Sequence, residues 1–220
     1  MIHSVIPLSR IKPKSAGGYR AMPLSAVLTE GFLRRGSSFF LDGQPGAGKT
    51  TLFFQAMASI VEFSGKPIVF NTTEQSLDAI ASTFERLELD TAYIHVTTSE
   101  NIELALEFAT INNCAGLFVD SLNRSNISHL RKGETVLSGV ATALCKWAIA
   151  NNGVAGGVRQ INIKGDAAGE VAISHLPDCC LHLEVSDSGE RTLSTSKNRH
   201  GEAPYSVKMS MTKRGLVLNG

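Results

Sequence analysis

Short apolar runs alternate with amphipathic segments along most of this chain. The apolar runs predict strands at residues 37–41, 68–71, 92–96, 117–120 and 154–158. Between them, apolar positions at helical spacing predict helices at residues 51–60, 76–87, 102–111 and 135–150. A chain in which strands alternate with helices typically forms a parallel sheet with right-handed crossovers, and its ligands bind at the carboxyl ends of the strands.

The pattern changes after residue 178, where three β-type runs follow one another with little room for helices. They cover residues 179–185, 191–196 and 205–211, and the turn Asp187-Ser188-Gly189 separates the first two. Such runs indicate hairpins that extend the sheet. The predicted fold is therefore α/β, with a mostly parallel central sheet flanked by helices and with β-hairpins near the C-terminus.

The segment between the first strand and the first helix carries the most specific chemical signal. It has the pattern Gly-x4-Gly-Lys-Thr, in which glycines let backbone N–H groups converge on the phosphates of a nucleotide. Lys49 supplies a positive charge for the outer phosphates, and the Thr50 hydroxyl is a ligand for Mg²⁺. We predict ATP and Mg²⁺ as cofactors, bound by Gly43, Gln44, Pro45, Gly46, Ala47, Gly48, Lys49, Thr50 and Thr51.

Two carboxylates follow later strands. Asp120 ends the apolar run Gly116-Leu117-Phe118-Val119 and is placed to hold the metal ion through water, although an Asp in this position is often only a turn or helix cap. Glu74 follows the strand at 68–71 and is a candidate base for the attacking water. Because a helix is predicted to start near Ser76, Glu74 is equally interpretable as a favourable charge in the first helical turn.

The composition agrees with one compact domain, because 43% of the 220 residues are hydrophobic and can form a sizeable core. No apolar stretch approaches the ~20 residues needed to cross a bilayer, and the N-terminus lacks the pattern of a secretory signal. We therefore expect a cytoplasmic protein without a membrane partner. The four cysteines include no Cys-x-x-Cys pair, which favours buried reduced thiols over a zinc site.

The order of these motifs resembles the ATPase core of the RadA/Sms branch of the RecA superfamily. The resemblance covers about residues 20–220, and residues 168–178 are also similar to a family segment. The resemblance to the family depends on four motifs: the 43–50 loop, Thr72-Thr73-Glu74-Gln75-Ser76, Val119-Asp120-Ser121 and Lys197-Asn198-Arg199-His200-Gly201.

This resemblance implies a RecA-like P-loop ATPase and assigns further roles. Glu74 matches the catalytic carboxylate, and Gln160 matches the residue that senses the γ-phosphate. Lys197 and Arg199 match cations that act in the ATP site of a neighbouring subunit. Without the neighbouring Asn-Arg-x-Gly pattern, a solvated strand end would be the favoured interpretation of these two residues. The resemblance also implies a homo-oligomer, either a hexameric ring or a filament.

Two polar segments occupy the positions of the DNA-facing loops in RecA-like proteins. The candidates for contact with single-stranded DNA are Arg124, Arg131, Lys132 and Lys164. The alternative interpretation is that both segments are ordinary solvated loops, because neither contains an aromatic residue for base stacking. The net charge of +1 does not discriminate between them.

The chain also differs from the family. RadA/Sms proteins combine the core with an N-terminal four-cysteine zinc finger and a C-terminal Lon-like domain, neither of which occurs in this sequence, and the signature Phe is replaced by His200. These differences leave ATP binding intact but remove support for branch migration. The preferred function is a DNA-dependent ATPase in recombination or repair. The alternative is a KaiC-like regulatory module whose ATP controls assembly, and a nucleotide kinase fits less well because no Arg-rich lid is found.

The N-terminal region has a composition of its own. The first 29 residues contain no acid but include Arg10, Lys12, Lys14 and Arg20. We interpret residues 1–19 as a basic arm before an ATPase domain at residues 20–220. Contact with a neighbouring subunit, contact with nucleic acid and disorder all remain open for this arm.

Overall fold

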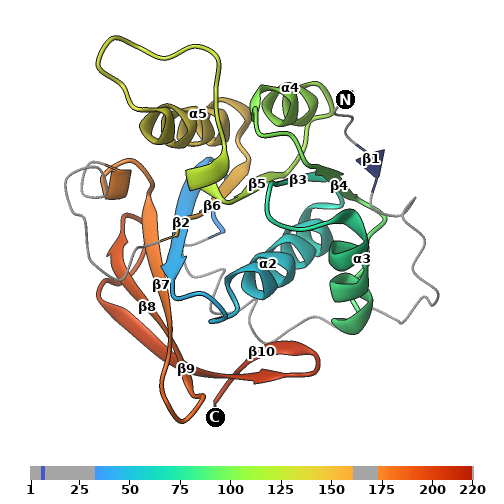
Figure 1. Cartoon of the computed structure of the whole chain (residues 1–220), viewed down its shortest axis with the longest axis vertical. Coiled ribbons are helices and arrows are strands. Elements are labelled where there is room, and N and C mark those ends of the chain that lie inside the picture. Colours follow the sequence, from blue (N-terminus) through green and yellow to red (C-terminus); the bar gives the residue numbers. More distant parts are fainter. Residues whose placement is uncertain (1–5, 8–32, 161–172, 220) are drawn as a thin grey trace.

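The structure, a computed structural model, describes residues 6–7, 33–160 and 173–219. In this part of the chain, ten strands form one sheet in the order β1-β4-β3-β5-β6-β2-β7-β8-β9-β10 (Figure 1). Six central strands are parallel: β4 (Ile94–Thr97), β3 (Ile68–Thr72), β5 (Gly116–Asp120), β6 (Val154–Val158), β2 (Ser37–Gly43) and β7 (Cys179–Val185). Their carboxyl ends therefore meet along one edge of the sheet.

Antiparallel strands flank this parallel core. On one side β7 continues into β8 (Arg191–Asn198), β9 (Tyr205–Thr212) and β10 (Gly215–Leu218). On the other side β1 (Ile6–Pro7) pairs with β4. The predicted α/β fold with a mostly parallel sheet and C-terminal hairpins is confirmed, whereas β1 and β10 were not predicted.

Helices cover both faces of the sheet (Figure 1). Helices α2 (Lys49–Ser64) and α3 (Leu77–Arg86) pack on one face, and α4 (Glu103–Ile111) and α5 (Val136–Asn151) pack on the other. The side chains of successive strand residues point to opposite faces of the sheet. Phe118 packs toward α2 and Val119 toward α5, so the parallel strands are apolar on both sides.

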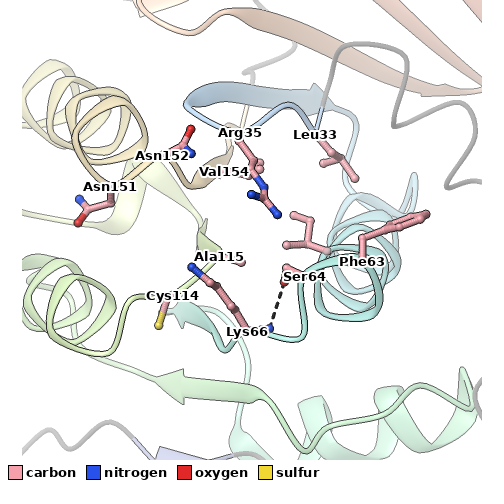
Figure 2. A pocket seen from close by; sticks show the side chains of 11 residues that line it. Leu33, Arg35, Phe63, Ser64, Lys66, Cys114, Ala115, Asn151, Asn152 and Val154 are labelled. Carbon is pink, nitrogen blue, oxygen red and sulfur yellow. Dashed lines mark hydrogen bonds between the residues drawn. The ribbon is translucent and has the colours of Figure 1, made fainter.

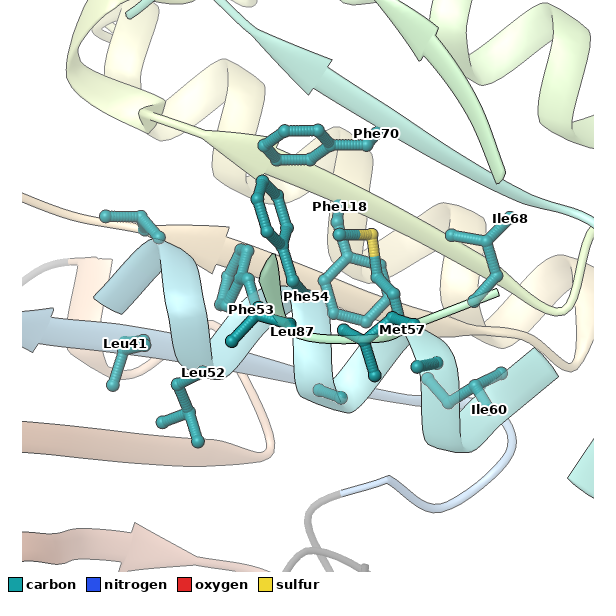
Figure 3. Packing of buried hydrophobic residues seen from close by; sticks show 14 of the residues in the cluster. Leu41, Leu52, Phe53, Phe54, Met57, Ile60, Ile68, Phe70, Leu87 and Phe118 are labelled. Atoms are coloured by element: carbon teal, nitrogen blue, oxygen red, sulfur yellow. The ribbon is translucent and has the colours of Figure 1, made fainter. Parts of the chain in front are cut away.

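Helix α2 lies in an aromatic core (Figure 3). The ring of Phe53 meets the ring of Phe118 edge-on at 5.2 Å, and Phe54 meets Phe70 in the same way at 5.3 Å. All four rings are fully buried, and such pairs add to the stability gained from burial alone. The core therefore fixes the position of α2 and of the loop that precedes it.

The element boundaries differ from the predictions at a few places. Helix α2 begins at Lys49 because Gly48 adopts a positive φ of 110°, and it runs on to Ser64, where Gly65 ends it with a φ of 61°. The strand expected at 92–96 is displaced to β4, because the Asp90 side chain accepts a hydrogen bond from the Ala92 N–H and folds these residues into a turn.

Some predictions lie outside the described residues. Of the basic arm at residues 1–19, only Ile6–Pro7 is described, and the segment with Lys164 is not described. Within the described ranges, no helix is both long and apolar enough to span a membrane. The four cysteines, all of which are described, are free thiols, and burial raises the pKa of Cys114 and Cys179 to about 12.

Candidate nucleotide-binding site

The predicted phosphate loop connects β2 to α2 and has a conformation that requires glycine. Gly43, Gly46 and Gly48 have φ values of 148°, 78° and 110°, which L side chains rarely adopt. A Cβ atom on Gly43 would also lie 2.2 Å from the Leu183 carbonyl oxygen. The loop leads directly into the N-terminus of α2, where backbone N–H groups and the helix dipole favour an anion.

Lys49 extends back across this loop. Its Nζ donates hydrogen bonds to the carbonyl oxygens of Gly43, at 2.7 Å, and Gln44, at 2.8 Å. An ammonium group has three protons, so one donor remains for a ligand. Burial lowers the pKa of Lys49, while the charges of Asp120, Glu74 and Asp42 oppose this shift.

The two candidate metal ligands are in direct contact. Thr50 Oγ1 donates a hydrogen bond of 2.6 Å to Oδ2 of Asp120, which lies at the carboxyl end of β5 and is 2% exposed. Burial raises the pKa of Asp120 to about 6, and the negative charge of Glu74 adds to the increase, whereas the bond from Thr50 and the charge of Lys49 oppose it. A hydroxyl and a carboxylate are oxygen donors of the kind that Mg²⁺ prefers, so these residues fit the expected ion.

Glu74 lies beyond β3 and is held by two donors. The Ser121 hydroxyl and the Gln160 side-chain amide both donate to its Oε1, the latter at 2.7 Å. Helix α3 begins only at Leu77, and its cap is Ser76. Glu74 is therefore outside the helix, and its interpretation as a first-turn helix charge is not supported.

Lys49, Thr50, Glu74 and Asp120 all line one cavity of about 510 Å³, which is large enough for a nucleotide. Ala47 and Gln44 belong to the predicted loop but do not line it. Gln75, Val158 and Met211 line the cavity although they were not among the predicted site residues. The lining consists of Gly43, Pro45, Gly46, Gly48, Lys49, Thr50, Thr51, Glu74, Gln75, Asp120, Val158, Gln160 and Met211.

The C-terminal hairpins support the phosphate loop. Arg191 in β8 donates a hydrogen bond of 2.9 Å from Nε to the Ala47 carbonyl oxygen. A Cβ atom on Gly48 would lie 2.7 Å from Cε of Met211 in β9. No local motif marks these contacts, because they join segments that are more than 140 residues apart.

Lys197 and Arg199 are not at the cavity of their own chain. Strand β8 runs antiparallel to β7 and ends beside Cys179, at the amino end of the parallel strands. Lys197 Nζ donates to the carbonyl oxygens of His175, at 2.8 Å, and Pro177, at 2.5 Å. Arg199 pairs with Asp178 at 3.1 Å. A catalytic role for either cation therefore needs a second subunit and remains a prediction.

Three of the four candidate DNA contacts are described, and they are exposed. Arg124 ends a 3-10 turn (Leu122–Arg124), and Arg131 and Lys132 lie further along the same connection between β5 and α5. Within the described residues none of the three forms an ion pair. Asn123 Oδ1 accepts the Gln160 N–H at 2.9 Å, so this connection contacts the residue that binds Glu74.

A smaller cavity of about 180 Å³ lies at the opposite edge of the sheet (Figure 2). Its lining includes the exposed side chain of Phe63, the cations Arg35 and Lys66, and the buried residues Cys114 and Val154. None of the candidate site residues belongs to this cavity.

Comparison with known proteins supports the resemblance seen in the sequence. No family model matches. The DNA repair protein RadA of Haemophilus influenzae is 28% identical over 208 residues, which is 93% of this chain, and RadA of Rickettsia conorii is 31% identical over 195 residues, or 85%. The chain is similar to the RadA ATPase core. It spans 44% and 43% of those two RadA proteins, so less than half of each is matched.

Two solved structures share the fold of this chain. The RadB recombinase has a TM-score of 0.64 at 19% identity, and the match covers 88% of this chain and 96% of RadB. A KaiC-like protein from Pyrococcus horikoshii has a TM-score of 0.69 at 17% identity, covering 95% and 99%. At these identities the two structures establish the fold alone.

Proposed function

We propose that this chain binds ATP with Mg²⁺ in the 510 Å³ cavity and hydrolyses it. The observation that carries the proposal is the contact of Thr50 with Asp120 in the same cavity that holds Lys49 and Glu74. A glycine loop, a cation, a pair of metal ligands and a candidate base are the parts that phosphoryl transfer to water requires.

Each residue has a defined task in this mechanism. The loop N–H groups and Lys49 bind the phosphates, and Thr50 and Asp120 would hold Mg²⁺, which neutralises phosphate charge when bound. Glu74 accepts a proton from the attacking water. Gln160 donates to Glu74 and is therefore positioned to report the state of the phosphate site to the residues that follow it in the sequence.

We further propose that Lys197 and Arg199 complete the ATP site of a neighbouring copy. The location of both cations at the amino end of β7, away from the cavity of their own chain, agrees with action in trans. Cations that stabilise the charge of the transition state contribute strongly to such reactions. Hydrolysis then depends on a homo-oligomer, either a ring or a filament.

The proposed substrate of the oligomer is single-stranded DNA, in recombination or repair. The sequence relatives are DNA repair proteins named RadA, and Arg124, Arg131 and Lys132 are exposed on the connection that follows Asp120. Lys164, which lies outside the described residues, is the fourth proposed contact. Contacts of this kind are sequence-independent and weaken as salt is added.

The KaiC-like regulatory module fits less well, because the KaiC-like protein matches by fold at 17% identity, whereas RadA matches by sequence at 28% to 31%. We place the ATPase domain at residues 20–220 and the basic arm at residues 1–19.

An ATPase assay with and without single-stranded DNA tests the proposal. We expect DNA to increase turnover, and we expect Lys49→Ala to abolish both ATP binding and turnover because the phosphate cation is lost. Slow turnover that DNA does not change, together with ATP-dependent assembly measured by light scattering, would instead support the regulatory module. Absence of nucleotide binding in calorimetry would refute both functions.

A further inference from the structure

Gln75 lines the cavity beside Glu74 and has an unusual environment. Its Oε1 is buried and has no hydrogen-bond partner among the described residues. The other unpartnered buried side-chain atoms in this part of the chain belong to Asn71, Thr73 and His95, none of which lines the cavity. Gln75 is thus the member of this group whose residue lines the cavity.

A buried amide oxygen without a donor is unfavourable, so a donor from the ligand side is expected. Phosphate oxygens of ATP only accept hydrogen bonds and cannot serve. Water in the phosphate region can, because it carries two O–H donors. Gln75 directly follows Glu74, the candidate base, and both line the same cavity.

The hydrogen bonds of Glu74 indicate how such a water is held. Its Oε1 already accepts from Ser121 and from Gln160, which fixes the carboxylate and leaves Oε2 for the water. Water that gives one proton to Glu74 has a second O–H that needs an acceptor. When both protons are engaged by acceptors on the protein, the oxygen lone pair is free to face phosphorus.

We propose that Gln75 Oε1 is this second acceptor and that Gln75 is a positioning residue for the attacking water. The inference rests on the proposed ATPase function. In the step, the water oxygen bonds to the γ-phosphorus as the bond from that phosphorus to the bridging oxygen breaks, and ADP leaves. One water proton passes to Glu74, and the other stays on the new phosphate, hydrogen-bonded to Gln75.

Three variants of the full chain test this role in steady-state ATPase assays. Gln75→Leu keeps the approximate size but removes the acceptor, and we expect kcat to fall about 10- to 100-fold with KM changed less than about twofold. Gln75→Glu restores an acceptor, so kcat recovers to within about fivefold of the original and falls in acid as the new carboxylate is protonated. Thr73→Val removes a buried, unpartnered hydroxyl outside the cavity, and kcat stays unchanged.

Several outcomes overturn the proposal. If Q75L keeps the original kcat, or raises KM alone, Gln75 does not position the water. If Q75E loses as much activity as Q75L, side-chain shape matters instead of the acceptor. Should Q75L fail to fold by circular dichroism, the pH profile of Q75E decides, and a profile identical to the original chain refutes the role.

The proposed function fails in a distinguishable way. If the original chain neither binds nor hydrolyses ATP, the ATPase proposal and the role of Gln75 fall together. If the original chain hydrolyses ATP and Q75L is equally active, only the role of Gln75 is wrong.

Discussion

Replacing Asp120 with asparagine tests the electrostatics of the cavity directly. Burial raises the pKa of the Asp120 carboxyl from 3.8 to about 6. The folded chain therefore holds this proton more tightly than the unfolded chain, and folding stability from this group is lost as the pH rises from about 4 to about 6. The pKa shift of about two units, at about 1.4 kcal/mol per unit, lowers the free energy of unfolding by roughly 3 kcal/mol at pH values above about 6.

Asp120→Asn keeps an acceptor for the Thr50 hydroxyl and removes the charge. At about pH 7.5, without nucleotide or metal, the variant should be more stable by about 3 kcal/mol, and near pH 4 the difference should disappear. For a chain of this size the gain corresponds to a Tm higher by roughly 6–12 °C. Mg-ATP should stabilise the original chain and not the variant.

Urea unfolding can be followed through the fluorescence of Trp147, the single tryptophan, which is 4% exposed in the folded chain. Groups that do not interact with Asp120 titrate alike in both proteins, so their effects cancel when the two stabilities are subtracted at each pH. A difference that stays constant between about pH 4 and 7.5, or a variant that is less stable at neutral pH, would refute the assigned cost of the buried carboxylate.

Three further changes have defined outcomes. Gly48→Ala puts a Cβ at a φ of 110°, and isothermal calorimetry should show weaker ATP binding by at least about tenfold, whereas unchanged affinity would contradict the required loop geometry. Asp42→Ala removes the carboxylate that pairs with the buried Arg159, and urea unfolding should show a free energy of unfolding lower by about 3–5 kcal/mol, whereas a loss of less than about 1 kcal/mol would show that the pair is unimportant. Replacing both Arg131 and Lys132 with alanine should reduce the salt dependence of single-stranded DNA binding by about 1.4 in the slope of log K against log salt, and an unchanged slope in fluorescence anisotropy would exclude these two contacts.

The parallel core could be predicted because its strands are apolar on both faces and therefore form continuous runs. Strands β6 and β7 begin and end where the sequence predicts them. Strand β10 could not be found in this way, because its Leu216 is fixed by paired hydrogen bonds to Gln55, a residue 161 positions away. The two-residue strand β1 depends in the same way on pairing with β4.

The residues of the candidate site were likewise predictable only where they belong to a local sequence pattern. The phosphate loop is a local pattern, so its glycines and Lys49 are recognisable without a structure. Met211 has no such pattern, since it lies in β9, far along the chain from the phosphate loop. Gln75 lies in a motif, but no local pattern shows that its side chain lines the cavity. For Glu74, the sequence left two interpretations open, and the start of α3 at Leu77 separates them.

The separation of the cavity from Lys197 and Arg199, which lie at opposite edges of one sheet, limits how copies can cooperate. If those cations serve a neighbour in a ring or a helical filament, each contact joins unlike surfaces of two copies head to tail. An open array of n copies then has n − 1 complete sites, whereas a closed ring has n. Turnover per molecule would accordingly rise with protein concentration until assembly is complete.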